Sequence, residues 1–435
     1  IAAFIIAFLF VPKLYNAGTI TIYGYLGQRY GAGAKSAAGI MFLLGRLLSS
    51  GARLFMAAIG FAMMLSGDTS ANDLVFAVLI LGAVGTLYTV FGGIRAVIWT
   101  DVLQLFVFTS ATLLALVYLW RLIPASSGEI LYALRSAEGG DKLRLVDMSL
   151  NISNPFTLWS GIVAMTVVGV STHGVDQDML QRVMTAKSSW HGGWALISSI
   201  LAAVPMVALF LGIGLLLHIY YQRPDLMGTA VPLDVIEDTR RIFPQFVLHH
   251  LPTGLRGLIM AGLFASAMST FDSAITAMAS CLVADIYAPW RAWHYGKAYS
   301  QGDAEEAGLP ELRQSRLAVA IMGALLTAVA VGAIYMQEGG GQNLIDFALG
   351  VMAFALAPLL GVFCTALFTR RGSTKSVYAA LGFGVFAVLL LQPYMLPAFL
   401  GIGIGWTWVW VFVSPLCFLV CMLGRPDGAG ERSVL

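Results

Sequence analysis

Long apolar runs with very little charge constrain the fold of this chain more than any other feature. Most of them are long enough for a helix to cross the hydrocarbon core of a bilayer, which takes about 20 residues. Apolar residues make up 58% of the chain and charged residues 11%, far from the composition of soluble domains. The ten-residue alternation of outer-membrane barrels is absent, so we expect an all-α transmembrane protein. The runs that we assign as eleven membrane segments cover residues 1–12, 36–66, 73–91, 94–120, 156–170, 193–217, 254–285, 316–336, 343–369, 377–395 and 404–423.

The same composition excludes several classes of function. The formal net charge is +2 and the chain has no tail rich in lysine and arginine, so nothing implies a nucleic acid or a protein partner. No nucleophile, metal cluster or phosphate-binding loop occurs at catalytic spacing, so we do not expect an enzyme. The chain opens at Ile1 inside an apolar run, without an initiator Met or a signal peptide, and we therefore expect a fragment whose preceding segment is missing.

The positive charges of the loops predict an orientation. If run 1–12 exits on the inner side, the inner loops hold most of the lysines and arginines, as the positive-inside rule requires. We expect a multi-pass protein of the cell membrane, and more narrowly of the bacterial inner membrane. Two outer loops, near 124–153 and 222–252, are long enough to hold short helices.

One apolar segment is too short for an ordinary span. Run 156–170 has about 15 residues before the polar stretch STHGVDQDMLQR, which begins at Ser171. The pattern predicts a broken helix. Non-helical backbone at membrane depth is tolerated where it lines a cavity, and transporters use such breaks to direct backbone dipoles at substrate and ions.

The stretch AMSTFDSAITAMAS, residues 267–280, places polar side chains deep within an apolar run. Ser269 lies near the bilayer midplane, about 15 residues from either end of run 254–285. Hydroxyls at this depth often bond to the carbonyl four residues earlier or join helices, which is a sufficient explanation for the hydroxyls alone. Asp272 favours a functional site, because a mid-membrane carboxylate costs about 2.5–3.5 kcal/mol even on mild scales. Such oxygens suit a hard cation. The polar face comprises Ser266, Ser269, Asp272, Ser273, Thr276 and Ser280.

Asp101 is a second carboxylate within an apolar run. It follows Gly92 and Gly93, where we expect the helix to break, and lies about two turns into the next helix. One alternative is an interfacial ion pair with Arg95. Its grouping with a threonine and a glutamine inside an apolar run favours a functional polar patch.

Four stretches of the chain occur in an order that is similar to one known family. They read VPKLYNAGTITIYGYLGQRYG, GGIRAVIWTDVLQ, DQDMLQRVMTAKS, and LPTGLRGLIMAGLFASAMSTFDS with a trailing ADIY. They resemble the sodium:solute symporter family, which includes the sodium/glucose cotransporters. The resemblance implies a leucine-transporter-like core of ten helices in two inverted five-helix repeats. It implies one transmembrane domain over 1–435, with core helices 2–5 in 1–123, core helices 6–10 in 154–370, extra C-terminal helices in 374–424, and the first core helix missing.

The resemblance also implies where cations bind. Family members hold one sodium ion with hydroxyls and a carbonyl of the eighth core helix, and the matching residues are Ser266, Ser269 and Thr270. Some members hold a second sodium ion with a carboxylate of the fifth core helix and hydroxyls of the eighth, matching Asp101, Ser269, Asp272 and Ser273. Asp272 replaces a hydroxyl that is common there, so two carboxylates would meet. Without a cation, one of them should be protonated.

Sugar-binding residues of the family are not matched. The sugar-carrying members use an aromatic pair, a lysine and a glutamine, and the matching positions here are Thr172 with His173, Ala202 and Leu349. The remaining candidates for the lining of a solute site are Thr172, His173, Asp176 and Gln177. His173 could equally be a packed histidine, and Asp176 could form an ion pair with Arg182.

Two arginines lie on one face of run 36–66. We expect Arg46 and Arg53 to pair helices or line a cavity, although an anionic solute would give one of them a direct role. Together these features predict a sodium-coupled symporter that imports a small organic solute by alternating access, with one or two Na+ ions as coupling ions. The alternatives are a solute-sensing receptor on the same fold and a proton-coupled transporter.

Overall fold

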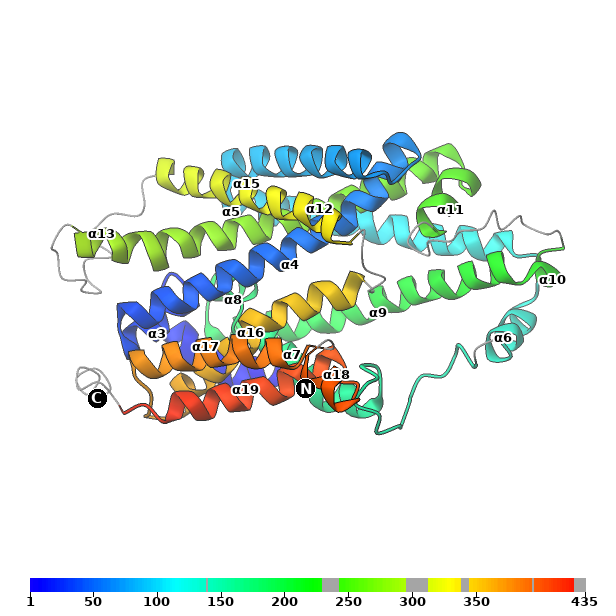
Figure 1. Ribbon diagram of the computed structural model, residues 1–435. Helices are drawn as coiled ribbons and strands as arrows, with labels where there is room; N and C mark the ends of the chain where they lie inside the picture. Colours follow the sequence, from blue (N-terminus) through cyan, green and yellow to red (C-terminus); the bar gives the residue numbers. More distant parts are fainter. Residues whose placement is uncertain (138–139, 229–241, 295–311, 338–343, 393–394, 426–435) are drawn as a thin grey trace.

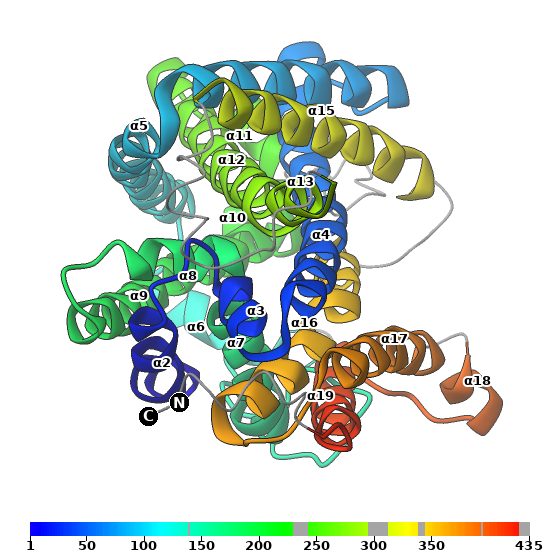
Figure 2. The same ribbon diagram turned by 90° about the vertical axis from the view of Figure 1, so that its left-hand side faces the viewer.

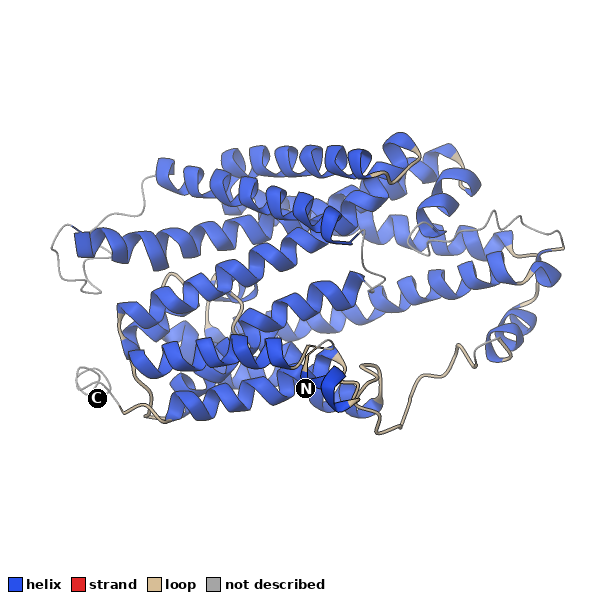
Figure 3. Cartoon of the chain, in the orientation of Figure 1, coloured by secondary structure: helices blue, strands red, loops and turns tan. Residues whose placement is uncertain are grey.

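The computed structural model describes residues 1–137, 140–228, 242–294, 312–337, 344–392 and 395–425. These residues form a bundle of helices, and no strand occurs within the described ranges (Figures 1 and 3). The all-α expectation is therefore confirmed for this part of the chain.

Seven helices in the described residues are long and apolar enough to cross a bilayer. They are α4 (Ala32–Ser66), the spans Ala71–Gly92 and Trp99–Leu122 of α5 (Ala71–Leu122), α9 (Ser189–Gln222), the span Thr253–His294, Gln314–Met336 in α15 (Leu312–Gln337) and Gly350–Phe368 in α16 (Leu344–Phe368). Shorter apolar helices cover Ala2–Asn16, α17 (Thr374–Leu390) and α19 (Trp406–Met422). With the broken helix described below, they account for the apolar runs of the sequence.

The broken helix is confirmed. A π-helical turn, η2 (Ser160–Ala164), leads into α7 (Met165–Gly174), and the helical backbone stops at Val175, with φ −132° and ψ 13°. The side chain of Asp176 then accepts a hydrogen bond from the backbone N–H of Asp178 and caps α8 (Gln177–Met184). The break thus exposes the N-terminal end of a short helix inside the bundle.

The expected break at Gly92 and Gly93 is wrong. Helical backbone continues through both residues, so α5 joins its two spans without a loop. Glycine in a helix interior costs only about 1 kcal/mol relative to alanine, which packing at the two spans can offset. The side chain of Arg95 in this join lies outside the described residues, as does any ion pair with Asp101.

Short helices occur in both of the long loops that the sequence predicts on the outer side. The first loop contains α6 (Ser127–Arg135), which starts with a reciprocal capping box between Ser126 and Glu129. The hydrogen bonds from Ser126 lower the pKa of the Glu129 carboxyl group. The second loop contains α10 (Pro224–Met227) and α11 (Ile242–His250).

The central helix of the bundle is α12 (Thr253–Cys281), which continues through the π-helical turn η4 (Leu282–Tyr287) into α13 (Ala288–His294). It packs along α5 and also contacts α4 and α15, as Figure 2 shows. Close approach requires glycine: a Cβ on Gly85 of α5 would lie 2.6 Å from the Phe271 ring, and one on Gly60 of α4 2.5 Å from Leu263. Small residues at helix contacts are typical of membrane bundles.

A buried carboxylate anchors the C-terminal end of this helix. Asp285 of η4 accepts a hydrogen bond of 2.6 Å from Thr21, the residue that caps α3 (Ile22–Tyr30), and lies 3.4 Å from the Lys35 ammonium of α4. The hydroxyl of Ser36 donates to the Asp285 carbonyl oxygen at 2.7 Å. These contacts fix η4 against α3 and α4 and so hold α12 in register with both.

Candidate functional site

The candidate cation-binding residues lie on the buried middle of α12. Asp272 and Ser273 are buried, and Ser266, Ser269 and Thr270 are half-buried. None of the five is exposed, so this polar edge faces other helices rather than lipid. The helix therefore has the oxygen-lined inner face that a cation site needs.

Several hydroxyls of α12 also bond to their own helix, as the simpler explanation predicts. The donor hydroxyl and the acceptor carbonyl are, in order, Thr270 to Ser266 at 3.2 Å, Ser273 to Ser269 at 2.7 Å, Thr276 to Asp272 at 2.7 Å and Ser280 to Thr276 at 3.0 Å. A hydroxyl that donates still has two acceptor lone pairs. These bonds orient the oxygens without removing their capacity to hold a cation.

Asp101 is the centre of a polar cluster that joins three helices. The Ser269 hydroxyl of α12 donates a hydrogen bond of 2.5 Å to Oδ1 of Asp101, on the second span of α5. The Arg182 guanidinium of α8 lies 3.2 Å from Oδ2 of Asp101 and also donates to the hydroxyl of Ser273. The side chain of Asp101 is 17% exposed and that of Arg182 41%, so solvent reaches the cluster.

Asp272 lies apart from this cluster. Its Oδ1 accepts a hydrogen bond of 3.2 Å from Thr89, on the first span of α5, and Thr89 also donates to the Gly85 carbonyl at 2.8 Å. Its Oδ2 is buried and has no hydrogen-bond partner among the described residues. The structure therefore brings Asp101, Ser269 and Ser273 together and gives Asp272 different neighbours.

The residues at the helix break are held by an arginine. Arg46 of α4 pairs with Asp176 at 3.0 Å and also with Asp178, and all three side chains are at most 3% exposed. The side-chain oxygen of the fully buried Gln177 accepts a hydrogen bond of 2.9 Å from the backbone N–H of Ile22. Asp176 and Gln177, expected as solute-lining residues, thus have structural partners at the break.

The alternative ion pair between Asp176 and Arg182 is wrong. Asp176 pairs with Arg46, whereas Arg182 pairs with Asp101. Asp176 caps α8 at its start, and Arg182 follows six residues later, about 240° around the helix at 3.6 residues per turn. The two side chains therefore point to different neighbours.

Thr172 and His173 lie half-buried on the last turns of α7. The Thr172 hydroxyl is 2.9 Å from Nδ1 of His173 and also donates to the Val168 carbonyl. Of the positions that match sugar contacts, Ala202 is exposed on α9, and the side chain of Leu349 is not described.

Arg53 has an unusual environment for a guanidinium. It lies two turns beyond Arg46 on the same face of α4 and is half-buried, and its Nη2 is 3.1 Å from the sulfur of Met352 on α16. Within the described ranges, no carboxylate lies at ion-pair distance from it. It is close enough to His173 and Asp176 to interact with them electrostatically. This cation therefore faces the broken helix without a direct counter-ion.

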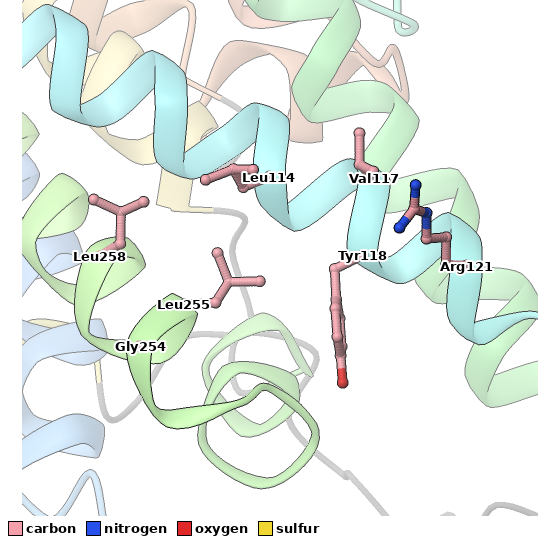
Figure 4. Close-up of a pocket in the computed structure, with 7 residues that line it drawn as sticks. All are labelled: Leu114, Val117, Tyr118, Arg121, Gly254, Leu255 and Leu258. Atoms are coloured by element: carbon pink, nitrogen blue, oxygen red, sulfur yellow. The ribbon is translucent and has the colours of Figure 1, made fainter.

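A cavity of about 380 Å³ lies elsewhere, at the C-terminal end of α5 and the N-terminal end of α12 (Figure 4). Its walls are mostly apolar, with Arg121 among the lining residues and none of the candidate cation or solute residues among them. The lining consists of Leu114, Val117, Tyr118, Arg121, Gly254, Leu255 and Leu258. This cavity is separate from the polar cluster.

Sequence reasoning missed Thr89 and the role of Arg182. Thr89 stands four residues after Gly85, where α5 packs closely against Phe271 of α12. A small residue four positions before a hydroxyl is the signal that could have marked this face of α5. The partner of Arg182 is Asp101, which is 81 positions away in the chain, and no sequence pattern indicated this pairing.

A bundle of membrane-length helices that surrounds a broken helix and a cluster of buried oxygens defines a class, the helical secondary transporters. A family model supports this assignment over most of the chain. The protein belongs to the sodium:solute symporter family, whose model matches residues 1–382. The resemblance noted in the sequence is therefore confirmed.

Curated relatives of this chain are transporters. The chain is 25% identical to the Homo sapiens sodium/iodide cotransporter, over 87% of this chain and 55% of the relative. It is 26% identical to the Danio rerio sodium-coupled monocarboxylate transporter 2, over 88% and 57%. It is 24% identical to the Aliivibrio fischeri sodium/sialic acid symporter NanT, over 89% and 71%. The chain thus spans little more than half the length of the first two relatives.

A solved structure has the same fold. It is a Na+-coupled sialic acid symporter in a substrate-bound outward-open state, with a TM-score of 0.75 and 19% sequence identity, and the match covers 97% of this chain and 81% of that chain. The likeness confirms the leucine-transporter-like fold of this multi-pass membrane protein.

Proposed function

We propose that this protein is a sodium-coupled symporter that imports a small organic solute by alternating access. One observation carries the proposal: the half-buried hydroxyl of Ser269 on α12 meets the carboxylate of Asp101 at a point where α5, α8 and α12 converge. A cation held there would contact three elements at once, so its binding would depend on their arrangement. We propose that the protein is not an enzyme, because the family to which it belongs consists of symporters.

The first sodium site is proposed at Ser266, Ser269 and Thr270. Their hydroxyl and carbonyl oxygens are hard ligands of the kind that small cations prefer. The bond from Thr270 to the Ser266 carbonyl supports this assignment, because it holds both oxygens at one turn of α12. Ser266 would offer its carbonyl oxygen, which retains a second lone pair.

The second sodium site is proposed at Asp101, Ser269, Asp272 and Ser273. Contacts among Asp101, Ser269 and Ser273 support it, whereas Asp272 would need to turn away from Thr89 to join. Two sites would matter energetically. A positive charge that moves inward at −100 mV releases about 2.3 kcal/mol, or roughly 50-fold accumulation, and a second charge squares that ratio.

We infer that the solute is a small organic anion. The relatives include transporters of iodide, monocarboxylates and sialic acid, all of which are anions at neutral pH. On this chain, Arg53 supports the inference because it is a half-buried guanidinium with no carboxylate at ion-pair distance in the described residues. A solute carboxylate would supply the missing counter-ion through a charge-assisted hydrogen bond.

Other residues near the break would complete the solute site. Thr172 and His173 would contact the polar end of the solute, since both are half-buried on the last turns of α7. Asp176 and Gln177 would act through the backbone of the break, which they hold in place with Arg46 and Ile22. The solute would thus be bound between α4 and α7.

Proton coupling is a second candidate, and a specific observation favours it. Oδ2 of Asp272 is buried without a hydrogen-bond partner among the described residues, which is costly for an ionised carboxylate. A proton on this oxygen would remove that cost. In that case Asp272 would carry the coupling ion, and sodium would bind only at the first site.

The repeats and the location follow from the same proposal. Residues 1–123 would belong to the first inverted repeat, 154–370 to the second, and 374–424 to the additional helices. We propose the inner membrane of a bacterium as the location. The likeness to a bacterial sialic acid symporter, which covers 71% of that relative, supports this location.

Uptake by the full-length protein in liposomes tests the function. A set of small carboxylates is first screened for solutes that raise the melting temperature in Na+ but not in K+. The selected solute should then accumulate in liposomes under an inward Na+ gradient. Accumulation driven only by an inward proton gradient would support proton coupling, and binding without flux would support a receptor. Equal uptake in Na+ and K+ without either gradient would contradict symport.

A further inference from the structure

The most informative unassigned contact in the molecule is the one that Arg182 makes with the proposed second sodium site. One guanidinium group touches the site from α8: Nη1 lies 3.2 Å from Oδ2 of Asp101, and Nη2 donates to the hydroxyl of Ser273. The remaining oxygen of Asp101 accepts from Ser269. The polar atoms of the cluster are therefore satisfied by a cation that belongs to the protein.

A sodium ion and this guanidinium cannot use the same oxygens. Ser273 donates its proton to the Ser269 carbonyl, and a free lone pair on its oxygen accepts from Arg182. A sodium ion in the second site would bind the same two oxygens, the Ser273 hydroxyl oxygen and Oδ2 of Asp101. It would also bring a second positive charge beside the guanidinium, where the partly buried setting screens repulsion poorly. Binding of the ion thus requires the guanidinium to leave.

The surroundings of Arg182 allow it to leave. Its side chain is 41% exposed, so water can solvate the guanidinium when it withdraws. The start of α8 is fixed, because Arg46 pairs with Asp176 and Asp178 there. Asp178 also lies 4.0 Å from Nε of Arg182 and would keep an attraction for the side chain as it turns outward. The movement therefore needs a change of rotamer and no unfolding of α8.

We propose that Arg182 is the resident counter-ion of this site, that sodium enters by displacing its guanidinium, and that return of the guanidinium expels sodium. The proposal rests on the sodium-coupled function proposed above. It makes Arg182 a positioning residue for ion release: the charge of Asp101 is neutralised in both states, first by sodium and then by arginine. The carboxylate never stays buried and unpaired, which would be unfavourable.

Sodium binding by the full-length protein in nanodiscs tests this exchange, without any need for the solute. Binding is measured with ²²Na+ for the wild type, for Arg182→Gln, and for Lys187→Gln as the control. Lys187 is exposed shortly after α8, so its substitution removes the same charge from the same region and leaves the cluster intact. Loss of the competitor should lower the apparent sodium Kd of Arg182→Gln about tenfold, whereas Lys187→Gln should stay within about twofold.

A chemical rescue separates displacement from a merely structural effect. In Arg182→Ala, added methylguanidinium should compete with ²²Na+ and restore the weaker sodium binding of the wild type, whereas tetramethylammonium should not. In Asp101→Asn, methylguanidinium should have no effect. An unchanged or higher sodium Kd in Arg182→Gln, or no competition by methylguanidinium in Arg182→Ala, would overturn the proposal. Absence of any sodium binding by the wild type would instead contradict the proposed function.

The exchange between sodium and the guanidinium also predicts how transport by Arg182→Gln should change. Because Arg182→Gln should release sodium slowly, uptake should saturate at lower sodium concentration while its maximal rate falls. A fall in rate with unchanged half-saturation by sodium, in protein with the wild-type melting temperature, would point to a structural role and would contradict the exchange.

Discussion

Ser269 of α12 and Asp101 of α5 form a hydrogen bond of 2.5 Å across 168 positions of the chain. The serine donates its proton to the carboxylate, so its lone pairs remain available to a cation on the same side. Ser269 is also the residue that both proposed sodium sites share. A change at Ser269 should therefore affect both ions, whereas a change at a residue of only one site should affect one.

Replacing Asp101 by Asn should weaken sodium binding strongly. The substitution keeps the shape of the side chain but removes the negative charge that accepts the Ser269 hydrogen bond, and hydrogen bonds to charged groups contribute about 1.5–3 kcal/mol. We expect the sodium concentration for half-maximal uptake to rise at least about tenfold. Asp73→Asn is the control, because Asp73 lies in the first turn of α5, where its carboxylate accepts a hydrogen bond from the capping residue Ser70. Equal sodium dependence in both variants would contradict the second site.

Replacing Thr270 by Ala tests the first site. The hydroxyl of Thr270 bonds to the Ser266 carbonyl and would be a direct sodium ligand. The matched control is Ser280→Ala, which removes a hydroxyl with the same kind of bond, to the Thr276 carbonyl, three turns further along α12. Thr270→Ala should raise the sodium requirement severalfold or abolish uptake, and Ser280→Ala should not. Unchanged sodium dependence in Thr270→Ala would refute the assignment.

Replacing Asp272 by Asn distinguishes the second sodium ion from a proton. If Asp272 joins a sodium site, the variant should carry less charge per solute, because one ion no longer binds. If Asp272 carries a proton, the variant should lose the pH dependence of uptake and keep its sodium dependence. Both are read from simultaneous current and tracer flux at several pH values. A charge-to-flux ratio and a pH profile equal to those of the wild type would exclude Asp272 from coupling.

How far the sequence predicted this site depends on the kind of information each residue carries. The polar face of α12 and the break after run 156–170 were predictable, because helical periodicity and span length are local properties. Local reasoning also placed Asp272 on the polar face. It lies at the edge of that face, one residue before Ser273, and the nearest helix decides its partner, which is Thr89 rather than Asp101.

Long-range pairing was the part that could not be predicted. Arg46 reaches Asp176 across 130 positions, and nothing in the sequence separates this pairing from one between Arg46 and another carboxylate. The same holds for Arg182, which is closer in sequence to Asp176 but on a different face of α8. The helical join at Gly92 and Gly93 shows a related limit: glycine lowers helix propensity, but tertiary packing determines whether the helix continues.

Arg46 and Arg53 form a matched pair for a test of stability. Arg46 is buried against two carboxylates, and removal of one partner of a buried ion pair typically costs about 3–5 kcal/mol. Arg53 has no carboxylate at ion-pair distance within the described residues, so its loss leaves no charge unpaired. Arg46→Gln should therefore lower the melting temperature in nanodiscs clearly more than Arg53→Gln. A similar loss in both variants would show that Arg46 does not hold the break.

Arg53 also gives the sharpest test of the solute class. If Arg53 binds the carboxylate of the solute, Arg53→Gln should raise the solute KM about 10- to 100-fold, the range of a charge-assisted hydrogen bond of about 1.5–3 kcal/mol. Sodium binding without solute should stay as in the wild type. Arg53→Lys keeps the charge and should recover part of the affinity, although an ammonium lacks the forked geometry of the guanidinium.

The amide of the same solute completes this test, because it removes the charge from the other partner. The wild type should transport the amide about as poorly as Arg53→Gln transports the acid, and Arg53→Gln should not distinguish the two. Such a cycle isolates the interaction between the guanidinium and the carboxylate from other effects of each change. If Arg53→Gln still prefers the acid over the amide by the wild-type factor, the carboxylate binds elsewhere, and the role of Arg53 is limited to its contact with Met352.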